Sequence, residues 1–389
     1  MPVMNTNHHP DLAALTTPRL LLDEARMDHN IQRMQRRLDE LGVAFRPHVK
    51  TTKCVDIARR QAAAGARGIT VSTLMEARVF HAAGFDDILY AVAIAPARLD
   101  EALELARRGC RLTLVVASVQ AAEMVAAHGR AQGHVHDVVI EIDTDGHRAG
   151  LKPDDAALPA TARALTVVER GGARLKGVMT HAGSSYGLDQ RDALIRLAEQ
   201  ERAGCVAAAQ RLRDCGLTCD VVSVGSTPTA LAAMNLDGVT EVRAGVYVFF
   251  DLVMAGTGVC RTDDIALSVL TTVIGHRVDT GWLVTDSGWM AMSRDRGTQR
   301  QAVDHGYGLV CDLAGTPIPG LSFAEANQEH GVLHWQGDPG TDLVARFPVG
   351  TLLRMLPNHA CATGAQHGQY TVIDASAAPV ATWERFRGW

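Results

Sequence analysis

The sequence predicts an α/β protein, a parallel (β/α)8 barrel followed by a smaller, mainly antiparallel β domain. Two observations predict the barrel. Eight short β-rich runs alternate with helical stretches between about residues 27 and 250, and near-continuous apolar strands of this kind are typical of a parallel sheet covered by helices. No GxGxxG fingerprint follows any of these strands, which weakens the alternative of a dinucleotide-binding open sheet.

The elements of the predicted barrel can be assigned in chain order. The predicted strands are residues 44–50, 68–73, 86–92, 112–118, 137–143, 175–181, 221–227 and 241–248. Alanine- and leucine-rich stretches at 54–65, 97–108, 119–132, 155–170 and 189–214 are the helices expected between them. Eight such units favour a closed barrel over an open doubly wound sheet.

After about residue 262 the pattern changes to short apolar or alternating runs separated by turn residues, without a long helical pattern. This predicts a compact β domain at 262–389. The barrel is then expected at 27–261. Residues 1–26 form an N-terminal segment whose LLLDEAR run is expected to pair with the β domain.

Composition excludes several classes of protein. The 389 residues carry 38 basic and 43 acidic side chains, a net charge of −5, with no basic block that would indicate nucleic-acid binding. No apolar run approaches the roughly 20 residues of a membrane helix, and the N-terminus lacks the order of a signal peptide. We therefore expect a cytoplasmic protein whose eight cysteines are free thiols.

Lys50 is the first candidate for chemistry. In the run from Ala44 to Lys50 every second residue is titratable, so one face of a strand is expected to carry Arg46, His48 and Lys50. An amine at the end of a buried strand is suited to Schiff-base chemistry, because desolvation lowers a lysine pKa. Spacing alone equally allows a solvated lysine, and Lys53 in the following turn is its competitor.

Three further polar segments follow predicted strands, where the catalytic rim of a (β/α)8 barrel lies. The turn Gly225–Thr227 joins a strand to a short helix and is a candidate anion site, or else an ordinary capped turn. Arg148 lies in a polar loop, and Tyr186 follows the strand that ends at His181. The loop with Arg148 could instead be a solvated turn.

His359 and Cys361 are two residues apart on a predicted strand, which would place both side chains on one face. Imidazole with thiolate suits zinc better than magnesium or calcium. Two protein ligands leave positions open for water or substrate. The other interpretation is a buried thiol beside a hydrogen-bonded histidine.

Eight ordered segments carry a resemblance to a known family: RPHVKTTK, STLMEA, DTDGHRAG, THAGSSYG, VGSTPT, RAGVYVFFD, NQEHG and LPNHACAT. Together they resemble the fold-type III, pyridoxal-phosphate-dependent D-serine dehydratase and D-threonine aldolase family, from about residue 16 to the C-terminus. The resemblance implies an alanine-racemase-like barrel and a lyase. It also implies a small D-amino acid as substrate and a homodimer as the assembly, with no nucleic-acid or membrane partner.

The resemblance assigns roles to individual residues. Lys50 carries pyridoxal 5'-phosphate and acts as the base, and Arg148 lies beside the pyridine nitrogen. Gly225, Ser226 and Thr227 hold the phosphate, while Tyr186 lies near the substrate and Tyr247 in the cofactor pocket. His359 and Cys361 bind Zn²⁺, or another divalent metal, which assists departure of the β-hydroxyl as a Lewis acid.

The reaction expected from the resemblance is elimination of water from a D-3-hydroxy amino acid, such as D-threo-3-hydroxyaspartate or D-serine, to give a 2-oxo acid and ammonia. The alternative is aldol cleavage to glycine and an aldehyde. The aldolase branch usually has aspartate where Cys361 stands, so cysteine favours the dehydratase. A non-catalytic cofactor carrier would lack residues 262–389, and a racemase would need a second base that Tyr307 and Tyr370 do not clearly supply.

Overall fold

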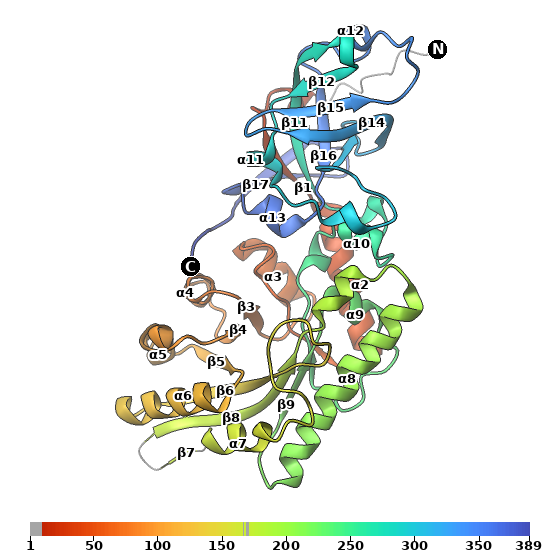
Figure 1. The fold of residues 1–389 in the computed structure, drawn as a ribbon. Helices are drawn as coiled ribbons and strands as arrows, with labels where there is room; N and C mark the ends of the chain where they lie inside the picture. The colour runs from red at the N-terminus through yellow and green to blue at the C-terminus, as the bar shows by residue number, and fades with distance from the viewer. Residues whose placement is uncertain (1–9, 166, 169–170) are drawn as a thin grey trace. The chain divides into compact units, whose positions relative to one another are not determined.

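A barrel of parallel strands forms one of two compact units of the chain (Figure 1). The computed structural model describes residues 10–165, 167–168 and 171–389. The parallel strands among them are β2 (Ala44–Phe45), β3 (Ile69–Val71), β4 (Asp87–Ala93), β5 (Arg111–Val116), β6 (Val135–Ile142), β8 (Gly171–Thr180), β9 (Val221–Val224) and β10 (Glu241–Val242).

The strands follow one another in the order β2-β10-β9-β8-β6-β5-β4-β3. The two ends of this order meet just after β2, where His48 forms a parallel bridge with Thr70. The Val49 amide donates to the Thr70 carbonyl at 2.9 Å, and the Thr70 amide donates to Pro47 at 2.8 Å. These bonds close the barrel immediately before Lys50.

Helices connect successive strands, as parallel pairing requires. They are α3 (Val55–Ala63), α4 (Leu74–Ala82), α5 (Leu99–Arg107), α6 (Val119–Gln132), α7 (Ala157–Ala164), α8 (Arg191–Asp214) and α9 (Thr227–Ala232). Leu89, Val115, Val139 and Met179, on four adjacent strands, pack together as a buried layer. Such layers fill the interior of a (β/α)8 barrel, so functional groups are expected at its rim.

An antiparallel barrel forms the second unit. Its sheet consists of β1 (Arg19–Asp23), β11 (Leu267–Arg277), β12 (Trp282–Thr285), β13 (Leu309–Cys311), β14 (Pro317–Ala326), β15 (Gly331–Trp335), β16 (Leu352–Leu356), β17 (Gln369–Ile373) and β18 (Pro379–Glu384). The strands β11, β12, β15, β14, β13 and β16 close on themselves, because β12 also pairs with β11. Short helices α10 (Leu252–Gly256), α11 (Trp289–Met292), α12 (Leu343–Arg346) and α13 (Ala360–Gly364) lie in the connections.

The strand β1 comes from the start of the chain but belongs to the antiparallel unit. It pairs antiparallel with β11 and parallel with β17. Leu21 packs in a buried cluster with Leu270 and Ile373, one residue from each neighbouring strand. Residues near both ends of the chain therefore build one core.

The predicted fold class is confirmed: a parallel barrel with an antiparallel β domain. The units contain residues 32–245 with Gly388–Trp389, and residues up to Ile31 with Val246–Arg387, whereas the sequence placed the boundaries after residues 26 and 261. Regular pairing in β2 and β10 covers only two residues each, so the predicted strands 44–50 and 241–248 were too long. Among the described residues, no helix combines the length and apolar character that a membrane crossing needs.

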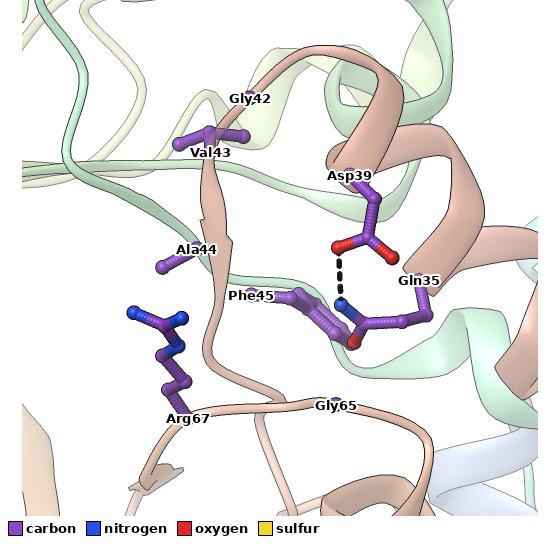
Figure 2. A pocket seen from close by; sticks show the side chains of 8 residues that line it. All are labelled: Gln35, Asp39, Gly42, Val43, Ala44, Phe45, Gly65 and Arg67. Atoms are coloured by element: carbon purple, nitrogen blue, oxygen red, sulfur yellow. Dashed lines mark hydrogen bonds between the residues drawn. The ribbon is translucent and has the colours of Figure 1, made fainter.

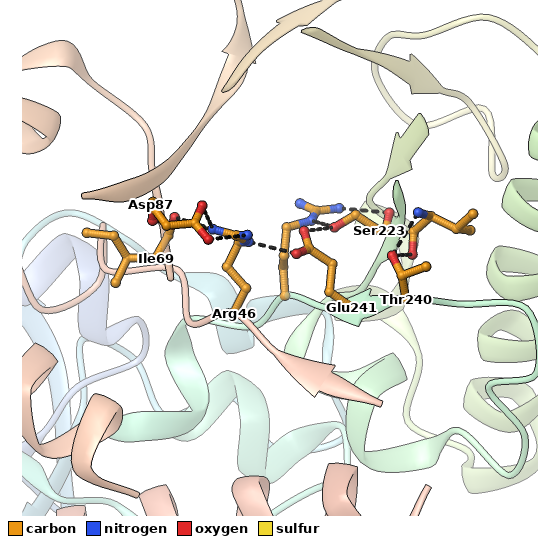
Figure 3. A network of polar contacts seen from close by, with 8 residues as sticks. Arg46, Ile69, Asp87, Ser223, Thr240 and Glu241 are labelled. Carbon is orange, nitrogen blue, oxygen red and sulfur yellow. Dashed lines mark hydrogen bonds and ion pairs between the residues drawn. The ribbon is translucent and has the colours of Figure 1, made fainter. Parts of the chain in front are cut away.

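Arg46 connects residues of three strands near the point where β4 begins (Figure 3). Its guanidinium lies 2.9 Å from Asp87 at the start of β4 and 2.8 Å from Glu241 in β10. Glu241 in turn accepts a hydrogen bond of 2.7 Å from Ser223 in β9. Arg46 is therefore committed to barrel structure, although it alternates with His48 and Lys50 in the sequence.

Candidate active site

Lys50 lies in the turn that follows the bridge between His48 and Thr70, rather than within a strand. Its side chain is exposed, so the burial that the sequence suggested is not provided by the chain itself. Among the described residues it makes no ion pair with a carboxylate. The amine is thus available to a ligand.

Lys53, the competing lysine, is occupied. Its Nζ lies 3.2 Å from the Glu76 carboxylate, which is completely buried. The same carboxylate accepts hydrogen bonds from the amide and the hydroxyl of Ser72, both at 2.9 Å. Separating Lys53 from Glu76 would leave a buried charge unpaired, which is costly. The structure therefore favours Lys50 as the reactive lysine.

Two histidines close to Lys50 are held neutral. Burial lowers the pKa of His48 well below its ordinary value, and the charges of Lys50 and Arg243 lower it further. Burial also lowers the pKa of His181 to about 4, despite a hydrogen bond of 2.9 Å from its Nδ1 to the Gly225 carbonyl. Because a carbonyl only accepts, the proton of neutral His181 lies on Nδ1.

Positive charge surrounds His181. The cations whose charges lower its pKa are Lys50, Arg243 and Arg148. Arg243 is buried and donates from Nε to the Ser223 hydroxyl at 2.8 Å and from Nη2 to the Thr180 carbonyl. Arg148 is half exposed and lies 2.9 Å from the buried carboxylate of Glu141. Such a site is complementary to an anionic ligand.

The turn Gly225–Thr227 leads from β9 into α9. Gly225 has φ +129°, and a Cβ there would lie 2.3 Å from the Arg243 carbonyl oxygen, so only glycine fits. The Ser226 hydroxyl caps α9 by accepting from the Thr229 amide at 3.2 Å. It also contacts the Ser185 hydroxyl at 2.8 Å, which connects the turn to the loop that contains Tyr186.

Glu201 in α8 holds two of these loops together. Its carboxylate accepts hydrogen bonds from the Ala182 amide at 2.8 Å and from the Gly225 amide at 3.1 Å. The side chain is buried, and burial raises the pKa of Glu201. Next to Ala182, the His181 ring lies 6.1 Å from that of Tyr186. Sequence reasoning missed Glu201 and Arg243, whose partners are distant in the chain, and also Glu141, whose partner Arg148 lies only seven residues away.

These barrel residues fit a phosphate-bearing aldehyde such as pyridoxal phosphate: the exposed amine of Lys50, two arginines and a glycine-containing turn at a helix start. Lys50, Arg148, Tyr186 and the turn all belong to the barrel unit. Tyr247 belongs to the antiparallel unit, where it is completely buried in the short 3-10 helix Val246–Val248.

His359 and Cys361 do not lie on a strand, which corrects the sequence prediction. The strand β16 ends at Leu356, His359 is the N-cap of α13 and Cys361 lies in its first turn. The two side chains are nevertheless close together, since a hydrogen bond between them contributes to the raised pKa of His359. Extended backbone at His359, followed by a helical turn, brings the two side chains together. The sequence pattern instead predicted that strand alternation would do this.

The charges around this pair favour a cation. His359 Nδ1 lies 2.7 Å from the Asp295 carboxylate. Burial lowers the pKa of His359, but hydrogen bonds to Asp295 and Cys361 outweigh burial and raise that pKa to about 11. A divalent metal can take the place of that proton, and imidazole with thiolate suits zinc. No third His, Cys, Asp or Glu completes a metal-binding group in the described part of the chain.

Asp251 supports the same segment. It is buried, and burial raises the pKa of its carboxyl. One carboxylate oxygen caps α10 by accepting from the Met254 amide at 2.9 Å, and the other accepts from the Ala360 amide at 2.9 Å. Asp251 thus fixes the backbone between His359 and Cys361.

A cavity of about 430 Å³ lies elsewhere, at the start of β2 (Figure 2). Its lining includes Arg67, Asp39 and Gln35, whose amide donates to Asp39 at 2.9 Å. Lys50 follows the opposite end of β2. The cavity therefore lies away from the groups described above.

Comparison with known families agrees with both units. The model of the alanine racemase N-terminal domain matches residues 22–253, and that of a serine dehydratase domain matches residues 266–373. A D-threo-3-hydroxyaspartate dehydratase from a Delftia species is 61% identical, over 97% of this chain and 99% of the relative. A D-threonine aldolase from an Arthrobacter species is 30% identical, over 93% of this chain and 90% of the relative.

Solved structures of related enzymes also match this chain over nearly its whole length. The structure of the Delftia dehydratase superimposes with a TM-score of 0.94, covering 97% of this chain and all of that one. The same enzyme has been solved as a histidine-to-alanine variant and as a cysteine-to-alanine variant in a metal-free form. The two substituted positions are two residues apart in that enzyme, as His359 and Cys361 are here.

Proposed function

Since the chain belongs to the family that joins an alanine racemase N-terminal domain to a serine dehydratase domain, we propose that it removes water from a D-3-hydroxy amino acid. The product is a 2-oxo acid with ammonia, and D-threo-3-hydroxyaspartate is the preferred substrate. The observation that carries the proposal is the 61% identity, over nearly the whole chain, to a dehydratase of that compound. The protein is accordingly a pyridoxal-phosphate-dependent lyase.

The barrel unit binds the cofactor. When bound, pyridoxal phosphate supplies an electron-withdrawing ring that acidifies the Cα–H bond of an attached amino acid. The turn Gly225–Thr227 binds the phosphate, and Lys50 supplies the amine for covalent attachment. Arg148, held by its ion pair with Glu141, would lie beside the pyridine nitrogen. Tyr186 contributes to the substrate side.

Lys50 also serves as the general base. Its amine is exposed and has no carboxylate partner among the described residues, so no ion pair must break before it reacts. The neighbouring His48 and His181 are neutral at physiological pH because their pKa values are lowered. They therefore add no competing positive charge, and Lys50 accepts the Cα proton.

His359 and Cys361 hold a divalent metal, for which zinc is the best match to an imidazole and a thiolate. Bound there, the metal supplies Lewis-acid chemistry for a leaving hydroxyl. Asp251 keeps the two ligands in register by binding the Ala360 amide between them. An aspartate ligand would suit a harder metal, so Cys361 distinguishes this chain from the aldolase branch.

Identification of the products tests the proposal. Purified protein loaded with pyridoxal phosphate and zinc is incubated with D-threo-3-hydroxyaspartate. We expect oxaloacetate and ammonia in equal amounts, and a loss of at least about 10²–10⁴-fold in Lys50→Arg, which cannot act as base at neutral pH. Lys53→Arg, which keeps its ion pair with Glu76, is the matched control and should remain active.

Glycine and glyoxylate as products would instead establish aldol cleavage, to which the Arthrobacter relative gives some support. D-Serine lacks the second carboxylate of hydroxyaspartate. Comparing the rates with the two substrates therefore measures how much that carboxylate contributes to turnover. Arg46 cannot bind that carboxylate, because Asp87 and Glu241 already occupy its guanidinium.

We further propose that the protein acts as a cytoplasmic homodimer without nucleic-acid or membrane partners. The support is the mild charge balance and the resemblance of the whole chain to enzymes acting on small molecules. Light scattering coupled to gel filtration measures the mass, and a mass of about 42 kDa, that of one chain, would contradict the dimer.

A further inference from the structure

Asp295 makes a close polar contact with His359, the histidine of the proposed metal site. It lies 64 residues before His359 in the sequence, in the loop after α11, and its Oδ2 is 2.7 Å from His359 Nδ1. The two side chains are 32% and 42% exposed, so a ligand can reach the histidine without passing through a sealed core. Nothing in the spacing of the sequence indicates this pair.

We propose that Asp295 is a positioning residue that fixes the tautomer and the orientation of His359 for metal binding. The inference rests on the proposed metal site at His359 and Cys361. A carboxylate can only accept a hydrogen bond, so the single proton of neutral His359 is drawn to Nδ1. The lone pair is then left on Nε2, the remaining ring nitrogen, and is available to the metal.

The backbone on either side of the pair is rigidly connected. Asn358, which precedes His359, is buried, and its amide donates to the backbone carbonyls of Asp295 at 3.0 Å and Gly306 at 2.7 Å. Its oxygen accepts from the Thr298 hydroxyl at 3.2 Å. These bonds therefore connect the loop that contains Asp295 to the segment that contains His359. The connection lies one residue before His359. This leaves the imidazole little freedom to turn.

A role as a third ligand does not explain the contact. The carboxylate is directed at the ring nitrogen, and the described residues contain no group of three or more His, Cys, Asp or Glu that could hold a metal. A purely structural role makes a different prediction, because it would affect the stability of the metal-free protein and leave the affinity for metal unchanged. The experiment below separates the two.

The experiment measures the zinc dissociation constants of the cofactor-loaded protein and its variants by competition with a chromophoric chelator. Asp295→Ala should weaken zinc binding about 10–100-fold, the usual cost of losing an outer-shell partner. Asp295→Asn keeps an oxygen that accepts from Nδ1 and should bind zinc more tightly than Asp295→Ala. Cobalt titration provides a second readout, because the thiolate-to-cobalt absorption should appear only at higher cobalt concentration in Asp295→Ala.

The matched control is Asp86→Ala. Asp86 also lies 3.0 Å from a histidine Nδ1, that of His81, but in the barrel unit. Its loss should leave the zinc affinity unchanged. The melting temperature of each metal-free variant is recorded beside its zinc affinity. A zinc affinity of Asp295→Ala within twofold of the wild type would overturn the inference, as would a lowered metal-free melting temperature with unchanged affinity.

The outcome does not depend on the proposed reaction. If the wild type produced no ammonia but Asp295→Ala still bound zinc more weakly, the proposed function would fail and the role of Asp295 would stand. If oxaloacetate and ammonia were formed while the zinc affinity did not change in Asp295→Ala, the function would stand and this inference would fail.

Discussion

At the scale of single residues, the β unit brings a histidine and a cysteine close together. Cys361 is partly exposed, whereas Cys54, Cys205 and Cys311 are buried. Burial raises the pKa of Cys205 and Cys311, to about 12 for Cys311. Those thiols are therefore inert at neutral pH, and Cys361 has both the partner and the access that a metal ligand needs.

We predict that Cys361→Ala loses metal and turnover together. Removing one of two protein ligands should weaken zinc binding by more than the about 100-fold that an outer-shell partner is worth. Elemental analysis after gel filtration measures the bound zinc, and a strong chelator should have the same effect on the wild type while leaving the cofactor absorbance in place. Cys215→Ala, at the exposed cysteine that is the C-cap of α8, is the control. Full activity of metal-free protein would refute the metal dependence.

His136 allows a pH prediction far from the site. It is buried at the start of β6, its ring contacts His128 and His134, and burial with those neighbours lowers its pKa to about 4, against a smaller opposing effect of Asp137. Above pH 6.5 both folded and unfolded chains keep it neutral. Between pH 6.5 and 4 the unfolded chain takes up a proton that the folded chain does not, so the free energy of unfolding falls.

For His136 that loss should amount to about 2 kcal/mol at pH 5 and about 3 kcal/mol below pH 4. His136→Asn, which cannot take up the proton, should lose less stability between pH 7 and pH 5 than the wild type. Urea unfolding at the two pH values measures the difference. Equal losses in both proteins would show that His136 does not contribute.

At the scale of elements, α13 shows how a short helix can escape sequence analysis. A histidine and a cysteine two residues apart satisfy strand alternation, and a helix of five residues is too short for a 3.6-residue period to be recognised. The pair was selected by its chemistry, and its metal-binding role stays a prediction, but the local structure assigned to it was wrong. Only the contacts of the neighbouring segments decide between the two conformations.

Asp251 should stabilise the protein more than an ordinary helix cap does, because it binds both α10 and α13. Asp251→Ala removes the cap of α10, worth about 1 kcal/mol, and leaves the buried Ala360 amide without its acceptor, at about 1–3 kcal/mol. We predict a total loss of about 2–4 kcal/mol in urea unfolding. Asp342→Ala, which only removes the cap of α12, should cost about 1 kcal/mol. Similar losses in the two variants would show that the bond to Ala360 contributes little.

The residues that support the site were not predicted from the sequence, for a common reason. Asp251 reaches its partner across 109 residues and Asp295 across 64. Even Glu201, 19 residues from Ala182, lies in the middle of a long helix where a glutamate has no distinguishing local pattern. Motifs report residues that meet within a turn or a strand, whereas these contacts depend on how distant elements pack.

At the scale of the molecule, the count and order of the barrel strands were predictable because each βα unit repeats the same local pattern. The ends of the strands were not. Regular pairing stops after Phe45, yet single hydrogen bonds around His48 and Thr70 continue the barrel wall to Lys50. The barrel is therefore held at its seam by few backbone bonds, and side chains must contribute.

Arg46 is the side chain best placed to hold the barrel together near this seam. It is 13% exposed and joins β2 to Glu241 and Asp87 on other strands, so Arg46→Ala leaves the largely buried Glu241 carboxylate unpaired. We predict a loss of about 3–5 kcal/mol in the unfolding of the barrel unit. Arg174→Ala breaks an ion pair with Asp137 in which the arginine is mostly exposed, and should cost less than about 1 kcal/mol. Similar effects of both would contradict this role of Arg46.

The position of β1 has a consequence for how the chain is made. Its partners β11 and β17 begin at Leu267 and Gln369, whereas β1 ends at Asp23. At ribosomal rates of about 5–20 residues per second, roughly 20–70 s separate the appearance of β1 from that of its second partner. Until β11 appears, both edges of this apolar strand are unpaired, and one edge stays unpaired until β17 appears. A chaperone bound to its first 25 or so residues would protect the emerging polypeptide from misassembly on the ribosome.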